Sequence, residues 1–254
     1  MQRLLIDIGN SNIKAALGKD KVIIETFAKT PYKKSNFQSD FNKFIKKHFR
    51  FYKDDICSIG ISLCDPKYKP SCSDTIKKHF ATLPYYITYN SKLSIRIDYP
   101  KTLGVDRICS SVAAVNRYKN FKNILVIDYG TATTFNIIIN KTFTGGLICP
   151  GVQTGLNSLI QNTSLPLPII EKAKRINLIS KNTDSAIISG VIYQTIGLTN
   201  FVITELQKRY KGLMIICTGG LGKIFSQKIK QIRKYHPLLV LEGINEILKI
   251  NIIK

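Results

Sequence analysis

The sequence predicts an α/β protein made of two similar halves, and three observations support this fold class. Two short segments half a chain apart are nearly the same, since Leu4–Asn12 reads LLIDIGNSN and Leu125–Thr133 reads LVIDYGTAT. Strand and helix patterns follow each segment in a similar order. Hydrophobic residues make up 44% of the 254 residues and are spread along the chain, so each half can bury its own core. We therefore expect a duplicated fold with a cleft between the halves.

The first half, which we place at residues 1–115, reads as β-β-β-α-β-α-β. Short apolar runs separated by glycine turns predict a strand meander, and apolar residues at helical spacing predict an amphipathic helix after it. The expected elements are strands at 4–7, 13–17 and 22–27, a helix at 36–50, a strand at 56–63, a helix at 74–80 and a strand at 85–88. A helix over 107–118 is expected to lead into the second half.

The second half, residues 116–254, repeats this order. A second meander is expected with its turn at Asn140-Lys141, and a helix is expected after Pro150, which suits an early helical position. The expected elements are strands at 124–128, 133–139 and 143–147, a helix after 150, a helix at 183–210, a strand at 213–217, a helix ending near 229, a strand at 238–241 and a helix at 245–250.

The net charge of +22 raises nucleic acid as a partner, because 38 Lys and Arg residues face 16 Asp and Glu residues. The basic residues are spread from Lys14 to Lys254 and form no uninterrupted arm. A lysine-rich, solvated surface explains this distribution better, so nucleic acid is not expected as a partner.

The chain is expected to be cytoplasmic, without a membrane anchor. The apolar run at its start is too short for a signal peptide, and no run reaches the roughly 20 apolar residues that span a bilayer. The six cysteines contain no C-x-x-C pair and favour reduced thiols. Zinc is not expected, because the three histidines show no ligand spacing against the cysteines.

Both repeated segments end an apolar run on an aspartate and continue into a glycine turn. Asp7 would attract Mg²⁺, since hard cations prefer oxygen ligands, and Asp128 could hold a cation in the second copy. Donors to phosphate follow at Gly9, Asn10, Ser11 and Asn12, with Lys14 adding charge and Thr131 serving the second turn. One such turn alone would be interpreted as a plain hairpin. Two matching copies favour a site for nucleotide phosphates and their metal.

A third motif, Gly104-Val105-Asp106-Arg107, precedes an expected helix. Arg107 can hold a substrate carboxylate with two hydrogen bonds, and Asp106 can accept a hydroxyl proton. Taken alone, the motif could equally start a helix with Asp106 paired to Arg107. Its meaning depends on the other motifs.

Together these motifs resemble the type III pantothenate kinases, a group that includes Bvg accessory factor-like proteins. The matching motifs, in the order of the family, are Asp7-Ile8-Gly9-Asn10-Ser11, Gly104-Val105-Asp106-Arg107, Asp128-Tyr129-Gly130-Thr131-Ala132, the glycine and proline turn at 145–151, Asn182-Thr183 with Ala186 and Gly190, Thr218-Gly219-Gly220, and His236-Pro237-Leu238-Leu239-Val240-Leu241-Glu242-Gly243. Ser11 stands where the family usually has threonine, which keeps the hydroxyl.

The resemblance implies an acetate and sugar kinase/Hsc70/actin type of fold with two ribonuclease H-like halves. It implies ATP-dependent phosphorylation of pantothenate to 4'-phosphopantothenate, the first step of coenzyme A synthesis. Asp106 resembles the acceptor of the substrate proton, and Asp128 the ligand of K⁺ or NH₄⁺, which the family uses beside Mg²⁺. Thr183 matches a threonine that reaches pantothenate across a homodimer interface. The expected ATP residues are Asp7, Ile8, Gly9, Asn10, Ser11, Asn12, Ile13, Lys14 and Thr131, and the expected pantothenate residues are Tyr99, Gly104, Val105, Asp106, Arg107 and Thr183.

Two other functions remain open at this stage. A kinase of the same fold could act on a sugar or another small alcohol, because only the substrate site separates it from a pantothenate kinase. A non-catalytic regulatory or nucleic-acid-binding protein would use the positive charge. The substrate tyrosine is also open, since Tyr99 lies near the motif while the commoner offset of the family falls on Ile97.

Overall fold

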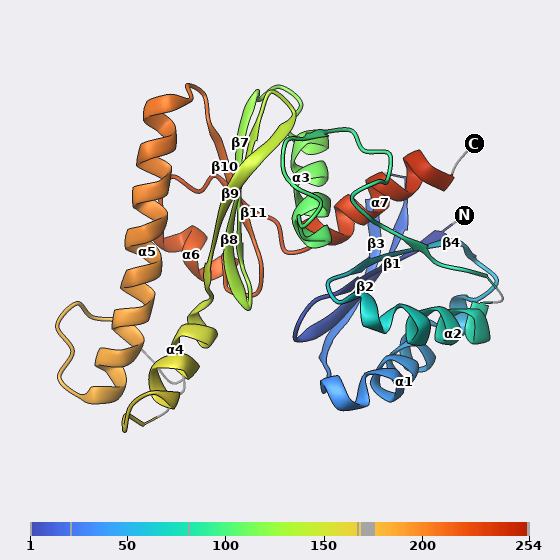
Figure 1. Ribbon diagram of the computed structural model, residues 1–254, viewed down its shortest axis with the longest axis horizontal. Helices are drawn as coiled ribbons and strands as arrows, with labels where there is room; N and C mark the ends of the chain where they lie inside the picture. Colours follow the sequence, from blue (N-terminus) through green and yellow to red (C-terminus); the bar gives the residue numbers. More distant parts are fainter. Residues whose placement is uncertain (1, 21, 81, 167, 169–175, 253–254) are drawn as a thin grey trace. The chain divides into compact units, whose positions relative to one another are not determined.

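The computed structural model describes residues 2–20, 22–80, 82–166, 168 and 176–252 (Figure 1). The first sheet has the strand order β3-β2-β1-β4-β5. Its strands are β1 (Gln2–Ile8), β2 (Asn12–Lys19), β3 (Val22–Pro31), β4 (Ile56–Leu63) and β5 (Tyr85–Tyr86). β1 runs antiparallel to β2 and parallel to β4, and β4 runs parallel to β5.

The second sheet repeats this arrangement, with the order β9-β8-β7-β10-β11 and a further short strand, β6 (Arg96–Ile97), paired to β9. Its strands are β7 (Asn123–Tyr129), β8 (Ala132–Ile139), β9 (Thr142–Pro150), β10 (Met214–Thr218) and β11 (Lys234–Tyr235). β7 is antiparallel to β8 and parallel to β10, as β1 is to β2 and β4. The predicted duplication is therefore confirmed at the level of sheet topology.

Tertiary packing divides the chain into two units. The first contains the described residues of 1–120, 141–144 and 238–254, and the second those of 121–140 and 145–237. The first unit thus takes in the chain end beyond residue 237, whereas the sequence placed a single boundary after residue 115.

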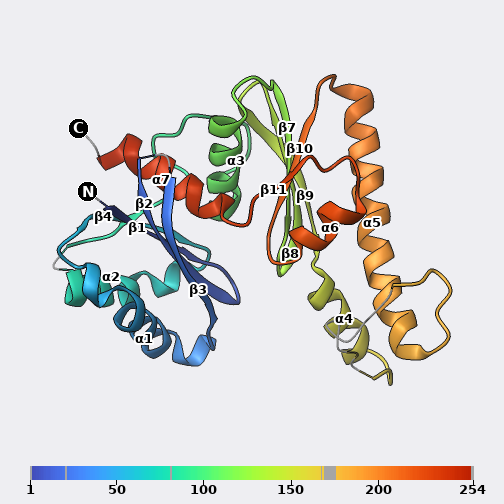
Figure 2. The same cartoon turned by 180° about the vertical axis from the view of Figure 1, so that it is seen from behind.

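Helices cover both faces of the first sheet (Figures 1 and 2). On one face, α1 (Phe37–Phe49) and α2 (Lys69–Phe80) pack against alternate β1 residues such as Leu4 and Ile6. On the other, α7 (Leu239–Ile252) packs on β1, β2 and β4 and also on α3 (Val105–Arg117). Because side chains alternate along a strand, Asp7 points to the same face as Leu5, toward α3 and α7.

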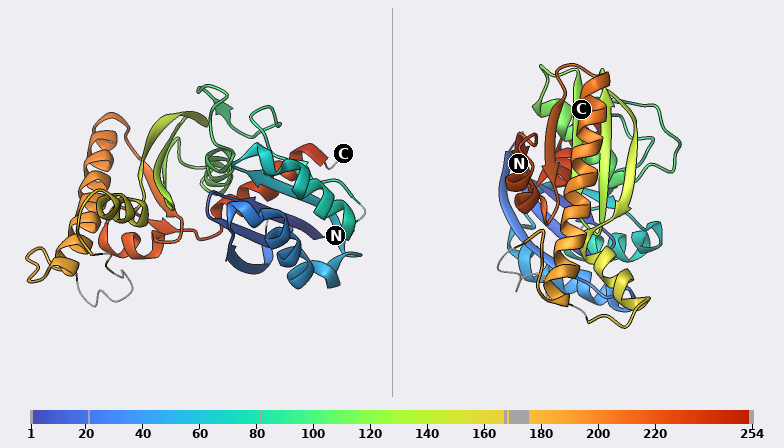
Figure 3. Two further views of the ribbon diagram at one scale, coloured as in Figure 1. Left: turned by 60° about the horizontal axis from the view of Figure 1, so that its bottom comes forward. Right: turned by 90° about the vertical axis from the view of Figure 1, so that its left-hand side faces the viewer.

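In the second unit, the long helix α5 (Thr183–Arg209) lies along the second sheet, as the right-hand view of Figure 3 shows. α5 and α6 (Gly222–Lys228) share an apolar core with β7 residues Leu125, Ile127 and Tyr129. α4 (Val152–Gln161) follows β9 directly and packs on α5.

Among the described helices, α5 alone is long and apolar enough to cross a membrane, by length and composition only. Its most apolar window has a mean hydropathy of 1.6, and 44% of that window is buried inside the protein. The same composition is typical of a helix that packs on a sheet, as α5 does on β7.

One predicted element is wrong: residues 238–241 form no strand, and Leu239 is the first residue of α7. Leu239, Val240 and Leu241 are all buried, because α7 is packed against α3 as well as the sheet. A helix with apolar residues on most sides lacks the one-sided period that identifies a helix in a sequence. The expected helix at 245–250 is the second part of the same helix.

Candidate active site

Asp7 lies at the end of β1, where the first sheet meets α3. It is paired with Lys14 of β2 and with Ser62 of β4. Only 6% of Asp7 is exposed, and its Oδ1 has no hydrogen-bond partner among the described residues. Burial raises the pKa of Asp7 to about 6; the charge of Lys14 opposes this rise, the charge of Asp106 contributes to it, and the neighbouring Ser62 hydroxyl opposes it. A buried carboxylate oxygen without a donor fits a cation, so the residues present suit Mg²⁺.

The turn after Asp7 is closed by one backbone hydrogen bond and one hydrogen bond from a tyrosine side chain. The Gly9 N–H donates to the Asn12 carbonyl at 3.1 Å, and the Tyr32 hydroxyl donates to the Gly9 carbonyl at 2.8 Å. Asn10 and Ser11 are exposed at the tip. This turn can present amide and hydroxyl donors to an anion.

Asp106 is fixed at the start of α3. Gly104 precedes the helix as its cap residue, and the Arg107 backbone N–H donates to Asp106 Oδ1 at 2.8 Å. Cys109 lies one turn further along and is fully buried. Burial raises the pKa of the Cys109 thiol, and the charges of Asp7 and Asp106 both add to that shift. Within the first unit, the charges of Asp7 and Asp106 therefore both act on the Cys109 thiol, and the charge of Asp106 acts on Asp7.

Arg107 is 6% exposed and lies beside a pair of aromatic rings that pack edge to face. Its guanidinium carbon is 5.2 Å from the centroid of the Phe143 ring and 5.8 Å from that of Tyr99. Burial lowers the pKa of Arg107, and Tyr99 opposes that shift. Ile97 instead pairs with Phe143 in the strand ladder, so Tyr99 is the residue whose ring lies beside Arg107.

The second turn is built on tight glycine contacts. Gly219 has φ +90°, and a side chain there would collide with Asp128 Oδ1 and the Tyr129 carbonyl. The Thr131 carbonyl accepts from the Gly151 N–H at 3.0 Å and from Thr154 Oγ1 at 2.6 Å. Asp128 and Thr131 are thus held at the end of β7, where the parallel strand β10 also ends.

Thr183 is the first residue of α5 and is exposed. The helix is capped by Asn182, whose Oδ1 accepts from the Ser185 N–H at 2.9 Å. Thr183 borders a groove within the second unit whose lining comes from α4, α5 and the segment before α5. Its lining includes Leu159, Thr183, Gly190 and Gln194.

The sequence reasoning missed three neighbours of these residues: Ser62 beside Asp7, Cys109 beside both aspartates, and Phe143 over Arg107. Ser62 had a usable signal, because it ends the strand that runs parallel to β1 and such ends meet at one edge of a sheet. Cys109 and Phe143 had none, since their contacts depend on how distant segments pack.

Two comparisons with known proteins bear on the chain. Residues 3–205 match the model of a protein family described as type III pantothenate kinase. Solved structures with similar folds include a Baf family transcriptional activator from Campylobacter jejuni, at 20% identity, 97% coverage of both chains and a TM-score of 0.62.

A ROK family protein from Streptococcus pneumoniae in complex with sucrose is 13% identical, with 98% of each chain covered and a TM-score of 0.55. The ethanolamine utilization protein EutJ from Carboxydothermus hydrogenoformans is 15% identical, with 96% of this chain and 89% of that chain covered and a TM-score of 0.54. At these identities the structural matches speak for the fold. They confirm the predicted duplicated ribonuclease H-like architecture.

Proposed function

The chain belongs to the type III pantothenate kinase family, and from this premise we propose how its residues transfer phosphate from ATP to pantothenate. The family makes the protein an ATP-dependent kinase that forms 4'-phosphopantothenate, the first step of coenzyme A synthesis. The observation that supports these roles is that Asp7 is buried with an unpartnered carboxylate oxygen and that the charge of Asp106 acts on it within the first unit.

Asp106 is the proposed general base. Its Oδ1 is held by the Arg107 N–H at 2.8 Å, which fixes the carboxylate and orients Oδ2 for the substrate hydroxyl. The proton of the substrate hydroxyl passes to Asp106 while the hydroxyl oxygen attacks the γ-phosphorus of ATP; the bond from that phosphorus to the bridging oxygen breaks, and ADP leaves. Arg107 and Tyr99 bind the substrate, with the buried guanidinium of Arg107 on the pantothenate carboxylate.

Asp7 is the proposed Mg²⁺ residue, directly or through water, because its Oδ1 lacks a donor. When bound, Mg²⁺ supplies charge neutralisation for the phosphates. The loop from Ile8 to Ile13 and the side chain of Lys14 hold the phosphate oxygens, and Thr131 adds an ATP contact from the second turn.

Two further proposals concern the cation and the assembly. Asp128 holds K⁺ or NH₄⁺, supported by its place at the glycine-lined end of β7. The enzyme is a homodimer in which Thr183 reaches the pantothenate of the partner, supported by the exposed groove beside Thr183. We expect it in the cytoplasm, which suits its six free cysteines.

A coupled assay with ATP, Mg²⁺, K⁺ and pantothenate tests the function. We expect turnover with pantothenate, none with a panel of sugars, and a lower rate when Na⁺ replaces K⁺. Folded dimeric protein that does not phosphorylate pantothenate would contradict the assignment.

Asp106→Asn tests the base. We expect kcat to fall by about 10² to 10⁴, the usual contribution of one general base, while the Kd for ATP stays nearly the same. Asp74→Asn on the exposed surface of α2 is the matched control and should keep the wild-type kcat. An unchanged kcat in Asp106→Asn would remove Asp106 from this role.

A further inference from the structure

Helix α7 begins within the closing motif at 236–243 and contains its residues from Leu239 to Gly243, and none of the roles above uses this motif. α7 lies in the first unit, where it packs on α3 and on the strands of the first sheet. α3 holds Asp106, and β1 of the sheet holds Asp7. α7 therefore contacts both elements that carry the two aspartates.

On the α3 side, the contact is backbone against backbone. A Cβ at Gly243 would collide with the Cα, carbonyl carbon and carbonyl oxygen of Cys109. A flexible side chain could move aside, but a helical carbonyl cannot move without shifting the helix. Cys109 lies on α3 one turn after Asp106, and the charges of Asp7 and Asp106 both act on its thiol. The closest approach of the two helices thus falls one turn from the proposed base.

On the sheet side, glycines again allow close packing. A Cβ at Gly60 of β4 would lie 2.8 Å from Ile244 Cγ2, and a Cβ at Gly18 of β2 would lie 3.2 Å from Asn245 Cγ. Both α7 residues are buried. Because Gly60 and Gly18 have no side chains, α7 packs directly on the backbone of the sheet at these two positions.

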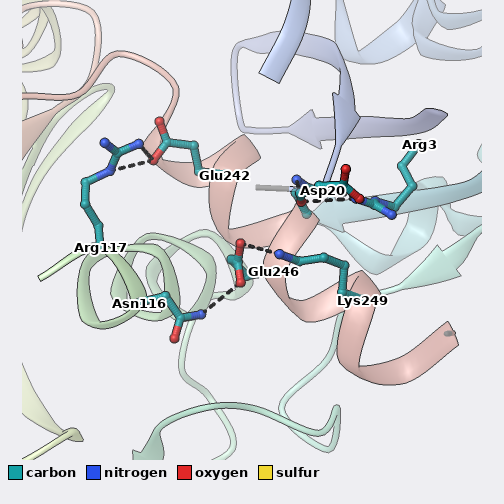
Figure 4. A network of polar contacts seen from close by, with 8 residues as sticks. Arg3, Asp20, Asn116, Arg117, Glu242, Glu246 and Lys249 are labelled. Atoms are coloured by element: carbon teal, nitrogen blue, oxygen red, sulfur yellow. Dashed lines mark hydrogen bonds and ion pairs between the residues drawn. The ribbon is translucent and has the colours of Figure 1, made fainter. Parts of the chain in front are cut away.

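Polar contacts fix α7 to its neighbours (Figure 4). Arg117 Nη2 donates to Glu242 at 2.9 Å, and Asn116 Nδ2 donates to Glu246 at 3.3 Å, which connects α7 to the end of α3. Toward the sheet, Asn245 is 2% exposed and accepts from Arg3 Nε at 2.8 Å. These contacts resist sliding of α7 along either neighbour.

From this packing we propose that α7 is a spacer that sets the position of α3 over the first sheet, and that Gly243 is a positioning residue for Asp106. The inference rests on the proposed role of Asp106 as the base. It adds that the geometry of the base depends on the absence of a side chain at residue 243. Gly243 acts through Cys109 and α3 and does not touch the substrate.

Gly243→Ala is the test, because it adds one methyl group at the point of closest approach. We expect kcat per folded active site to fall by about 10- to 100-fold, as a displacement near 1 Å can cause. The Kd for ATP should change by less than about threefold, since the phosphate turn at 9–12 is not displaced. A purely structural role would lower the melting temperature and the folded fraction but leave kcat per folded site unchanged.

Gly197→Ala is the matched control, since Gly197 is also helical and a Cβ there meets nothing within 4 Å. It should keep the wild-type kcat. If Gly243→Ala does not fold, the double variant Glu242→Gln and Glu246→Gln tests the proposal instead. It removes the negative charges that pair with Arg117 and Lys249, and because these ion pairs are partly exposed, the variant should still fold. We then expect kcat to fall about two- to fivefold with the ATP affinity kept, and a wild-type kcat would overturn the proposal.

The two failures are distinguishable. Full activity in Asp106→Asn would show that Asp106 is not the general base, and the proposed mechanism would fail. An inactive Asp106→Asn beside a folded Gly243→Ala with wild-type kcat would overturn only the positioning role of α7.

Discussion

The burial of Asp7 has a consequence for stability as well as for metal binding. The pKa of Asp7 is about 6 in the folded protein, above the ordinary aspartate value of 3.8. The folded state therefore holds the proton more tightly than the unfolded chain does. The contribution of the Asp7 carboxyl to the free energy of unfolding is fully present below about pH 4 and is lost as the pH rises toward 6. Above that pH the buried, ionised carboxylate costs about 3 kcal/mol.

Asp7→Asn should accordingly stabilise the protein in the absence of Mg²⁺ while abolishing its activity. We expect a higher melting temperature than that of the wild type at pH 8, and a difference that shrinks between pH 6 and pH 4. Thermal unfolding in a chelator at a series of pH values measures this. Asp20→Asn, at an exposed turn residue, is the control and should show no such pH-dependent gain.

Most candidate site residues could be named from the sequence because they belong to short local motifs. Asp7, Asp106 and Asp128 each follow or precede a glycine turn that is visible in a few residues. The influence of the Asp106 charge on Asp7 could not be predicted, because it depends on the packing of α3 against the first sheet. The ring of Tyr99 beside Arg107 was equally invisible, since spacing alone left Ile97 as the alternative.

At the scale of elements, two glycines with positive φ flank β10. Gly212 precedes the strand with φ +66°, and Gly219 follows it with φ +90°. A Cβ at Gly212 meets nothing within 4 Å, whereas one at Gly219 meets Asp128 and Tyr129. The two positions therefore separate backbone strain from steric collision.

We expect Gly212→Ala to lower the free energy of unfolding by about 1 kcal/mol, the cost of a left-handed alanine. Gly219→Ala should lower it by about 2 to 4 kcal/mol, because displacement of packed neighbours adds to the same strain. Urea unfolding of both variants measures the difference. Equal losses would mean that the contact with Asp128 is relieved without strain.

The meanders could be predicted because alternation of apolar residues and turn residues are local signals. The turn expected at Asn140-Lys141 is confirmed, with both residues at positive φ. β6 and β11 were missed because a strand of two residues shows too little pattern to identify it, and β5, which is equally short, was predicted only as part of a longer run at 85–88. The start of α7 was read as a strand because its burial on several sides removed the helical pattern.

At the scale of the whole molecule, the proposed homodimer makes a distinct prediction. Gly190 is exposed on α5, lines the groove beside Thr183, and a Cβ there meets nothing within 4 Å. An arginine at this position is compatible with the fold of one subunit but would block a partner. We expect Gly190→Arg to be a folded monomer.

Sedimentation of wild type and variant measures the assembly state. Activity of Gly190→Arg should fall by at least about tenfold, since a hydrogen bond from Thr183 of the partner would be lost with the interface. Gln227→Arg on α6 adds the same charge elsewhere in the second unit and should stay dimeric and active. A dimeric Gly190→Arg would place the interface on another surface.

The return of residues 239–252 to the first sheet also bears on synthesis by the ribosome. The strands of that sheet emerge early, but the face that α7 covers, with Leu5 in it, stays open until the last part of the second unit has been translated. At typical translation rates this interval is on the order of 10 s. During this interval the nascent chain exposes the apolar face of the first sheet to chaperones. A chain truncated before residue 239 lacks α7, so this face of its first unit stays uncovered.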